Sequence, residues 1–245
     1  MRIDIIIPAH NEEHRIARTL QAYRHDVTDP DVRFIVAMDA CTDGTEQVVA
    51  EHATADARVH AVAFPKLGKG GVIREAFGRS DADLIGFVDA DGATPPAEFM
   101  RLVDAADGAD GAIASRRHAA AVLPVSRPLR RRVASRGFAL GVRVLTGLRY
   151  ADTQCGAKVM HRDAAVASLE RVRTTDLSFD VDLLLAAEDL GLRLVEVPTV
   201  WIDRDGSRVD ALRDTRRMGG SLLRLWARRR LRAVLPPIGQ EVAHA

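Results

Sequence analysis

Residues 84–92 read Leu84-Ile85-Gly86-Phe87-Val88-Asp89-Ala90-Asp91-Gly92, an apolar run that leads into two carboxylates and a glycine. The first five residues carry no charge, and their length and flanks are typical of a buried parallel strand. Asp89 and Asp91 follow where that strand ends and the chain turns. Because open α/β sheets bind ligands at the carboxyl ends of their strands, this stretch predicts a binding position at the edge of such a sheet.

The two acids also indicate what could bind there. Like charges in a cleft disfavour each other's ionised form, and a divalent cation relieves that conflict. Oxygen ligands suit Mg²⁺ or Mn²⁺, and such ions usually share their coordination shell with substrate phosphates. The alternative is ordinary turn chemistry, in which Asp-Gly is common.

Strand and helix patterns alternate on both sides of this stretch. Apolar runs predict further strands at residues 3–8, 34–38, 59–64, 111–115 and 192–197. Helical spacing of apolar residues predicts helices between them, including an amphipathic helix over 133–148 and a helix over 179–190. The short connections predict an α/β fold, with a mostly parallel sheet flanked by helices and right-handed crossovers.

Length and composition predict one large domain. The chain has 245 residues, of which 47% are hydrophobic, enough for a single sizeable core. No internal repeat or linker is evident, so we expect one domain over residues 1–210 and a basic helical tail over 211–245. No apolar run approaches the roughly 20 residues that span a bilayer, and the N-terminus lacks a signal-peptide core. Cys41 and Cys155 form no CxxC pattern. We therefore expect a cytoplasmic protein whose membrane contact is peripheral.

The formal net charge of +1 hides an uneven distribution. Residues 1–110 carry 20 acidic and 11 basic side chains, whereas residues 111–245 carry 14 and 24. Residues 111–151 contain no acid and nine arginines, namely Arg116, Arg117, Arg127, Arg130, Arg131, Arg132, Arg136, Arg143 and Arg149. Residues 213–232 alternate eight arginines with large apolar residues. We expect the C-terminal half to meet an anionic partner, although a solvated helix face explains most of these arginines.

Six motifs, in this order along the chain, resemble those of family 2 glycosyltransferases with the GT-A fold. The likeness is greatest to the dolichyl- and polyprenyl-phosphate sugar synthases, especially the dolichyl-phosphate glucosyltransferase branch. The motifs are residues 5–13, 39–45, 68–70, 88–92 and 152–158, and Glu196-Val197-Pro198 with Gly206-Ser207-Arg208. Two departures are Ala157, where an aromatic residue is expected, and the lack of the membrane spans that some relatives carry after the catalytic domain.

The resemblance implies a sugar-nucleotide donor and assigns residues to it. Pro8, Ala9 and Glu12 would line the nucleoside pocket, and Asp39 would accept a hydrogen bond from the base. Lys69 and Asp89 would lie near the diphosphate. Each has a simpler alternative: Glu12 as an acid favoured by the helix dipole, Asp39 as an Asx turn, and Lys69 as a solvated loop lysine.

The same resemblance makes Asp89 and Asp91 the ligands of Mg²⁺ or Mn²⁺, with Asp91 also a catalytic residue. Negative charge develops on the β-phosphate of the departing nucleoside diphosphate as the glycosidic bond breaks. A cation held between the carboxylates and the diphosphate would stabilise that charge.

The basic tract favours a phosphate as the acceptor. A phosphate monoester has its second pKa at about 6, so it is largely dianionic at neutral pH and needs no general base. Guanidinium groups hold phosphate bidentately. The resemblance implies that Arg116, Arg131 and Arg204 hold a lipid phosphate, the first two as catalytic residues, while Arg130 and Arg132 remain alternatives to Arg131.

The sequence thus predicts an inverting, metal-dependent transfer of a hexose from UDP-glucose, or from GDP-mannose, to a polyprenyl phosphate. We expect this at the cytoplasmic membrane face, with peripheral contact to anionic lipid. We expect the apolar face of 133–148 to pack on the core and that of 222–231 to contact the membrane.

Two other interpretations remain. A sugar or small-molecule hydroxyl acceptor would require a carboxylate base, for which Asp152, Asp180 and Asp182 are the candidates. A non-catalytic module that binds nucleotide or anionic membrane belongs to another class. The aromatic content of 4% disfavours binding of single-stranded nucleic acid.

Overall fold

A computed structural model describes residues 1–124, 129–176, 178–202 and 211–234. Within two helices, the side chains of residues 129–134, 211–218 and 231–234 fall outside this description.

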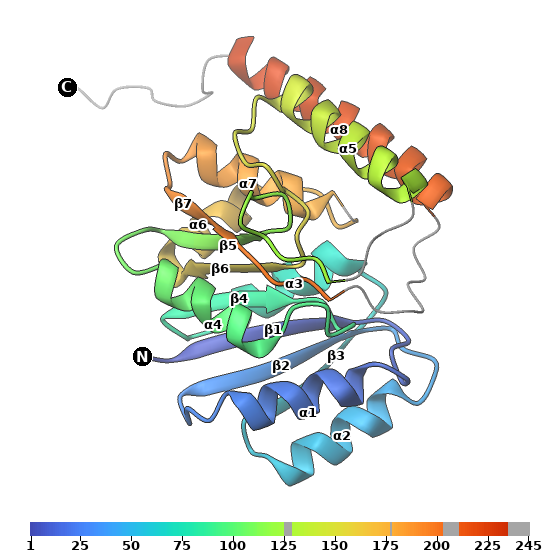
Figure 1. The fold of residues 1–245 in the computed structure, drawn as a ribbon, viewed down its shortest axis with the longest axis vertical. Coiled ribbons are helices and arrows are strands. Elements are labelled where there is room, and N and C mark those ends of the chain that lie inside the picture. Colours follow the sequence, from blue (N-terminus) through green and yellow to red (C-terminus); the bar gives the residue numbers. More distant parts are fainter. Residues whose placement is uncertain (125–128, 177, 203–210, 235–245) are drawn as a thin grey trace, which may run out of the picture.

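Within the described ranges, seven strands form one sheet in the order β3-β2-β1-β4-β6-β5-β7 (Figure 1). They are β1 (Ile3–Ala9), β2 (Val32–Asp39), β3 (Val59–Phe64), β4 (Leu84–Val88), β5 (Gly111–Ser115), β6 (Ala157–His161) and β7 (Leu194–Pro198). Only β6 runs against its neighbours, β4 and β5, and the other pairs are parallel. The predicted mostly parallel α/β sheet is confirmed. The sequence indicated a short strand after the polar loop at residues 152–158, which is β6, but its antiparallel direction was not predicted.

The central strands are apolar because both of their faces are covered. All five residues of β4 and all five of β5 are buried. Ile5 and Ile7 of β1 belong to one hydrophobic cluster, whereas Ile6 belongs to a second cluster on the opposite face. Successive side chains of a strand point to opposite faces, so one isoleucine run fills both cores.

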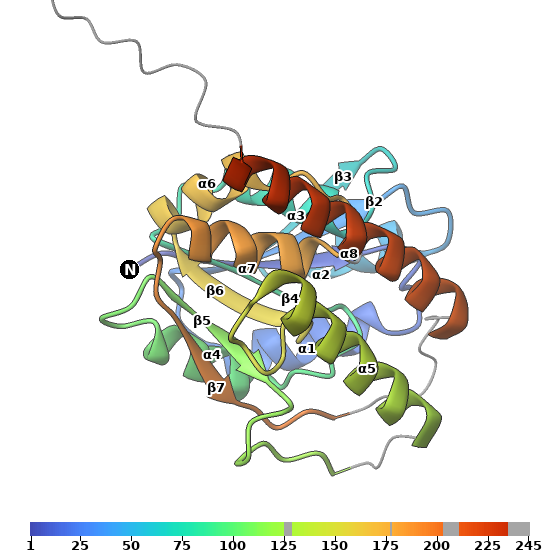
Figure 2. The same ribbon diagram turned by 90° about the horizontal axis from the view of Figure 1, so that it is seen from above.

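Helices cover the two faces of the sheet. The first cluster includes residues of α1 (Ile16–Asp26), α2 (Thr45–Ala55) and α4 (Pro96–Ala105). The second includes residues of α3 (Lys69–Arg79), α6 (Arg162–Arg171) and α7 (Phe179–Asp189). Figure 2 shows α3, α6 and α7 on one side of the sheet and α1 and α4 on the other. Helix α6 was not predicted from the sequence.

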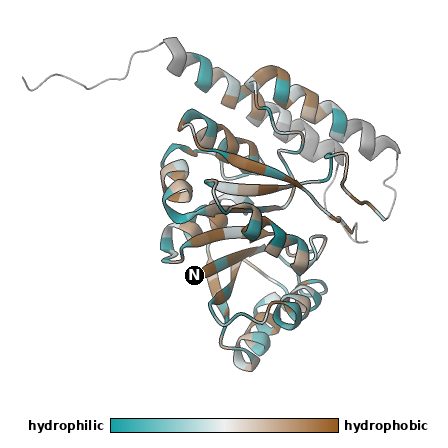
Figure 3. Ribbon diagram, turned by 60° about the vertical axis from the view of Figure 1, so that its left-hand side comes forward, coloured by the Kyte–Doolittle hydropathy of each residue, from teal (hydrophilic) through white to brown (hydrophobic). Residues whose placement is uncertain are grey.

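Helices α5 (Leu129–Thr146) and α8 (Ala211–Val234) lie side by side beyond α7 (Figure 1). Among their described residues, Val142 of α5 and Leu222 and Leu225 of α8 are buried in the cluster that contains α7. Among the residues that the structure describes, no helix is long and apolar enough to cross a membrane. Figure 3 shows apolar residues along the strands of the sheet and a mixture of apolar and polar residues on α5 and α8.

The predicted contrast between these two helices is therefore wrong in part. Leu222 and Leu225 of the tail pack on the core, whereas Leu223 and Trp226 face outward. On α5, Val142 is buried but Val144 is exposed. Residues three apart share a helix face, so each helix buries one stripe and exposes another.

Candidate active site

The carboxyl ends of four strands bring the predicted residues to one edge of the sheet. Ala9 ends β1, Asp39 ends β2, Asp89 follows β4 and Arg116 follows β5. Strand β6 is antiparallel, so it begins at this same edge, directly after Gly156. The parallel arrangement thus gathers residues from distant parts of the chain, as expected at the ligand-binding edge of an α/β sheet.

The backbone around Gly156 fixes the start of the Asp89-Ala90-Asp91 turn. The Asp89 N–H donates to the Gly156 carbonyl at 3.0 Å. A Cβ atom on Gly156 would lie 1.9 Å from Asp89 Oδ2, so this position accepts no side chain without a shift. On the other side, the Thr19 hydroxyl of α1 donates to the Ala90 carbonyl at 2.8 Å. The turn is held from two neighbouring elements.

The two carboxylates repel each other as expected. Burial and the charge of Asp89 raise the pKa of Asp91 above its ordinary value. Asp91 Oδ1 accepts a hydrogen bond from the Ala93 N–H at 2.9 Å. Such a pair fits a divalent cation, because the ion's charge offsets the repulsion. In the described part of the chain, no three His, Cys, Asp or Glu side chains form a metal site, so phosphate and water would complete the shell.

A partly buried network of alternating charges surrounds Asp89. Its Oδ1 lies 2.7 Å from the Lys69 ammonium, which is 3.6 Å from Asp180 Oδ2. Asp180 Oδ1 also accepts from Lys158 at 2.5 Å, and Lys158 donates to the Cys155 carbonyl at 2.7 Å. Lys69 thus lies beside the carboxylate turn, where it would add positive charge near a diphosphate.

The buried Asp180 and the partly buried Lys69 are both held in their charged forms. Burial opposes ionisation of Asp180, but the lysine ammonium groups outweigh it, so the pKa of Asp180 lies below its usual value. Burial likewise lowers the pKa of Lys69, and the charges of Asp180 and Asp89 more than reverse this, so its pKa is raised. Lys158 received no role from the sequence, although it closes the motif at residues 152–158.

The ends of β1 and β2 and the loop after β1 carry the residues predicted to bind a nucleoside. Pro8 and Ala9 end β1, in register with Ala37 and Met38 of β2. A ring nitrogen of His10 lies 2.6 Å from the Asp39 carbonyl oxygen, so the two loops are tied together.

The two acids predicted in this pocket are engaged within the protein. Both Arg15 contacts to Glu12, from Nε and Nη2, measure 2.6 Å. Asp39 accepts from the Lys66 ammonium at 2.9 Å and from the Leu67 N–H at 2.7 Å. Burial raises the pKa of Asp39, but these donors prevail, and its pKa lies below the ordinary value. A nucleoside would share or displace these bonds, so the predicted donor roles stay predictions.

Arg116 is held by Asp152 in a two-pronged ion pair. Its Nε and Nη2 donate to the two Asp152 oxygens at 2.7 and 2.9 Å, and its guanidinium lies 4.7 Å from the centre of the Trp201 ring. Burial opposes ionisation of Asp152, but Arg116 outweighs it and lowers the pKa of Asp152 to about 2. The sequence assigned Arg116 to a phosphate and did not identify Trp201. The two hydrogen bonds to Asp152 and the face of the Trp201 ring together orient the Arg116 guanidinium.

The carboxylates considered as general bases are all buried and bonded. Asp152 is paired with Arg116, and Asp180 with two lysines. Asp182 accepts from the N–H groups of Arg173 and Thr174 and from Arg228. A general base must reach the proton that it removes, and these arrangements disfavour all three.

The other predicted acceptor residues are not placed. Arg131 belongs to α5, but its side chain lies outside the described residues, as do those of Arg130 and Arg132. Arg204 also lies outside the described residues. Their roles remain predictions from the sequence.

Gly156→Ala is expected to lower activity of this site by about 10-fold or more, because the new Cβ would push the Asp89 carboxylate away from its position. Gly78→Ala is the matched control: a Cβ there meets nothing within 4 Å, and alanine should stabilise helix α3 by about 0.5–1 kcal/mol. Binding of Mn²⁺ measured by calorimetry should separate the two variants. Equal metal affinity in both would contradict the expectation.

Comparison with known proteins identifies relatives. Residues 4–167 match the family described as glycosyl transferase family 2. An undecaprenyl-phosphate mannosyltransferase of Micrococcus luteus is 32% identical over 84% of this chain and 85% of that protein. A dolichyl-phosphate beta-glucosyltransferase of Drosophila melanogaster is 28% identical over 93% of this chain and 75% of that protein. Glycosyltransferase AglD of Haloferax volcanii is 30% identical over 92% of this chain, which spans only 37% of that protein.

A solved structure shares the fold. The glucosyl-3-phosphoglycerate synthase of Mycobacterium tuberculosis, in complex with Mn²⁺, UDP and glucosyl-3-phosphoglycerate, superposes with a TM-score of 0.70. The likeness covers 97% of this chain and 82% of that one, at 18% sequence identity.

Proposed function

The chain belongs to glycosyl transferase family 2 and is a glycosyltransferase of the GT-A fold, and we propose that it moves a hexose from a sugar nucleotide to a polyprenyl phosphate with inversion and with a divalent metal. UDP-glucose is the favoured donor and GDP-mannose the alternative. The mannosyltransferase and the beta-glucosyltransferase among the relatives support mannose and glucose respectively. Both relatives are named for a polyisoprenoid phosphate, which supports such a phosphate as the acceptor.

Asp89 and Asp91 would hold Mg²⁺ or Mn²⁺, which when bound supplies a Lewis acid to the departing diphosphate. The protein itself contributes position and charge. Gly156 and Thr19 fix the turn that carries both carboxylates, and Lys69 places an ammonium 2.7 Å from Asp89. The related glucosyl-3-phosphoglycerate synthase structure, which holds Mn²⁺ and UDP, supports a metal and a nucleoside diphosphate at this edge.

The main support for a phosphate acceptor is that all three carboxylates considered as general bases are buried. Asp152, Asp180 and Asp182 are each nearly inaccessible and bonded to cations. A hydroxyl acceptor needs a base to remove its proton, whereas a phosphate dianion attacks without one. Arg116, at the end of β5, would orient that anion, with Arg131 and Arg204 as the further predicted ligands.

The test is transfer of radiolabelled hexose into a product that extracts into organic solvent. Polyprenyl phosphate is compared with the matched polyprenol, each with UDP-glucose or GDP-mannose, and with Mg²⁺, Mn²⁺ or a chelator. We expect transfer only with the phosphate and only with metal. Transfer to the polyprenol at a similar rate would favour the hydroxyl alternative. Donor binding without transfer to any acceptor would favour a non-catalytic module.

We also propose peripheral contact with an anionic membrane through α5 and α8, on the cytoplasmic face. Among the side chains of these helices that the structure describes, four large apolar ones are exposed: Leu140 by 63%, Val144 by 74%, Leu223 by 56% and Trp226 by 36%. Arginines lie among them, such as the exposed Arg143. Apolar side chains flanked by arginines are typical of helices that bind the surface of an anionic bilayer.

Replacing Val144 and Leu223 by glutamate is expected to abolish sedimentation with vesicles that contain anionic lipid, because it removes apolar area and adds repulsion. Val122→Glu is the control, since Val122 is 52% exposed but lies outside both helices. Binding should weaken with added salt and with neutral lipid. Equal sedimentation of wild type and both variants would refute membrane binding through α5 and α8.

A further inference from the structure

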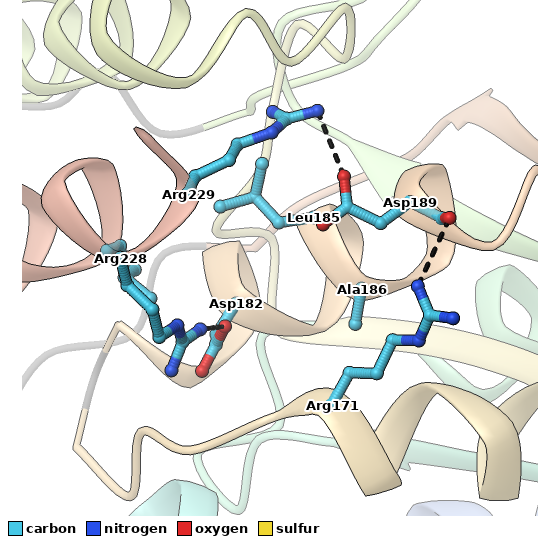
Figure 4. Close-up of a pocket in the computed structure, with 8 residues that line it drawn as sticks. Arg171, Asp182, Leu185, Ala186, Asp189, Arg228 and Arg229 are labelled. Carbon is cyan, nitrogen blue, oxygen red and sulfur yellow. Dashed lines mark hydrogen bonds and ion pairs between the residues drawn. The ribbon is translucent and has the colours of Figure 1, made fainter. Parts of the chain in front are cut away.

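The first turn of α7 lies between the candidate active site and the C-terminal helix α8. Asp180 in this turn bonds Lys158 and lies near Lys69. Asp182, two residues later, accepts from Arg228 of α8 (Figure 4). Both aspartates are buried, so this single turn joins the charges of the site to a charge on α8.

The loop before α7, residues 173–176, links Asp182 to the start of α3 by hydrogen bonds. Asp182 Oδ2 accepts from the N–H groups of Arg173 and Thr174 at 2.8 and 3.0 Å. The next carbonyl, that of Thr175, accepts from the Gly70 N–H at 3.0 Å. Gly70 follows Lys69, so the bonds run from Asp182 through the loop to the residue beside the lysine of the site.

Two glycines let α3 approach this loop closely. A Cβ on Gly68 would lie 2.6 Å from the Thr175 carbonyl oxygen, and a Cβ on Gly70 would lie 2.4 Å from Phe179 Cβ. Gly68 also has a φ of +78°, which favours glycine. Movement of the loop or of the α7 turn would therefore be transmitted to α3, because no gap separates them.

A second side chain of α8 holds the other end of the loop. The Ser221 hydroxyl donates to Asp176 Oδ2 at 2.6 Å, and Asp176 Oδ1 accepts from the Ser178 N–H at 2.8 Å. Ser221 and Arg228 lie seven residues apart, two helical turns, so they present neighbouring positions of one helix face to the loop.

We propose that Arg228 and Ser221 are positioning residues for the donor site, which act through Asp182, Asp176 and residues 173–176 to place Lys69 and Asp180 beside Asp89. The inference rests on the proposed function and deepens it. Helix α8 is then part of the frame of the active site, and the helix proposed to meet the membrane is also the one that orders the charges around the donor.

Arg229 provides a matched control on the same helix. It forms an ion pair with Asp189 at 3.1 Å, near the last turn of α7, and it donates to the Thr146 carbonyl of α5. Figure 4 shows Arg228 and Arg229 directed to different ends of α7. Among the described contacts, none joins Arg229 to residues 172–176. Loss of Arg229 therefore weakens the docking of α8 without touching the loop.

The experiment compares Arg228→Gln, Arg228→Lys and Arg229→Gln in the full chain. Hydrogen exchange of the peptide that contains the Gly70 amide reports, without any ligand, how readily the bond from Gly70 to the Thr175 carbonyl opens. Calorimetry with Mn²⁺ and UDP, or GDP, reports the donor site. Kinetics with each substrate varied separate the KM for donor from that for acceptor. Thermal midpoints show how far each variant loses stability.

We expect Arg228→Gln to speed exchange at Gly70, to weaken nucleotide binding by about 10-fold and to raise the KM for donor but not for acceptor. Arg228→Lys should restore most of the nucleotide affinity and of the protection at Gly70. Arg229→Gln should match wild type in exchange at Gly70, in nucleotide binding and in the KM for donor, despite a loss of thermal stability similar to that of Arg228→Gln. Unchanged exchange at Gly70 in Arg228→Gln, or the same change in Arg229→Gln, would overturn the proposal. If the exchange pattern is as expected but the wild-type chain binds no nucleotide, the positioning stands and the proposed function fails.

Discussion

Asp91→Asn is expected to lower metal-dependent sugar transfer by about 10³-fold or more, equivalent to about 4 kcal/mol of transition-state stabilisation at 1.36 kcal/mol for each factor of ten. The proposed metal would lose one of its two protein ligands from the turn after β4. Among the described residues, no cluster of acids or histidines offers a replacement. The effect should appear in the rate of label transfer at saturating donor, with Mn²⁺ and with Mg²⁺.

The same substitution should leave the metal-free protein as stable as wild type, or more stable. The amide oxygen of the new asparagine would still accept from the Ala93 N–H, which Asp91 now bonds at 2.9 Å, while the repulsion with Asp89 would disappear. Mn²⁺ with UDP should raise the thermal midpoint of the wild-type chain but not of the variant, because only a ligand that binds the native state stabilises it. Asp107→Asn, the same change at an exposed loop position, is the control. Full activity, or a collapse of stability before metal is added, would contradict the assignment of Asp91.

Asp152→Asn is expected to lower the free energy of unfolding by about 3–5 kcal/mol near neutral pH. Its carboxylate is 2% exposed and is the two-pronged partner of Arg116. Asparagine cannot balance the guanidinium charge, which would remain within the protein against the Trp201 ring. Urea unfolding at constant ionic strength measures the loss, and the KM for acceptor should also rise as Arg116 loses its orientation.

The pH dependence of that loss has a definite sign. The folded protein lowers the pKa of Asp152 to about 2, whereas an unfolded aspartate titrates at about 3.9. A lowered pKa stabilises the fold above the unfolded pKa, and this contribution is lost as the pH falls through the folded pKa. The difference between wild type and variant should therefore stay constant from about pH 5 to 8 and shrink from about pH 4 to 2.

Asp81→Asn is the matched control for this prediction. The pKa of Asp81 is likewise lowered to about 2 by Arg33 and Arg2, but its side chain is 61% exposed. Water screens such a pair, so the substitution should change stability little. If both variants lost the same free energy of unfolding, or if the difference between wild type and Asp152→Asn did not change with pH, burial would not control the strength of the Arg116–Asp152 pair.

Much of the fold could be predicted from local pattern. The stretch at residues 84–88 lies in β4 with the predicted ends, and the alternation of apolar runs and amphipathic segments indicated the parallel strands and most of the helices. Where the apolar pattern was weaker, the prediction failed: α6 is short and rich in alanine and charged residues, so few large apolar side chains mark its helical period. The tail was assigned to the membrane because hydrophobicity does not tell which stripe of a helix meets the core.

The sequence by itself determined the edge at which the site is built. Asp39 ends a parallel strand, and Asp89 and Arg116 directly follow two others. Parallel strands end on one side of a sheet, so the meeting of these residues there required no knowledge of packing. Their partners depended on tertiary structure. Arg116 meets Asp152 across 36 residues, Lys158 meets Asp180 across 22, and Arg228 meets Asp182 across 46. In each pair the tertiary fold brings a cation to a buried carboxylate, and burial makes that carboxylate require a partner that no local pattern specifies.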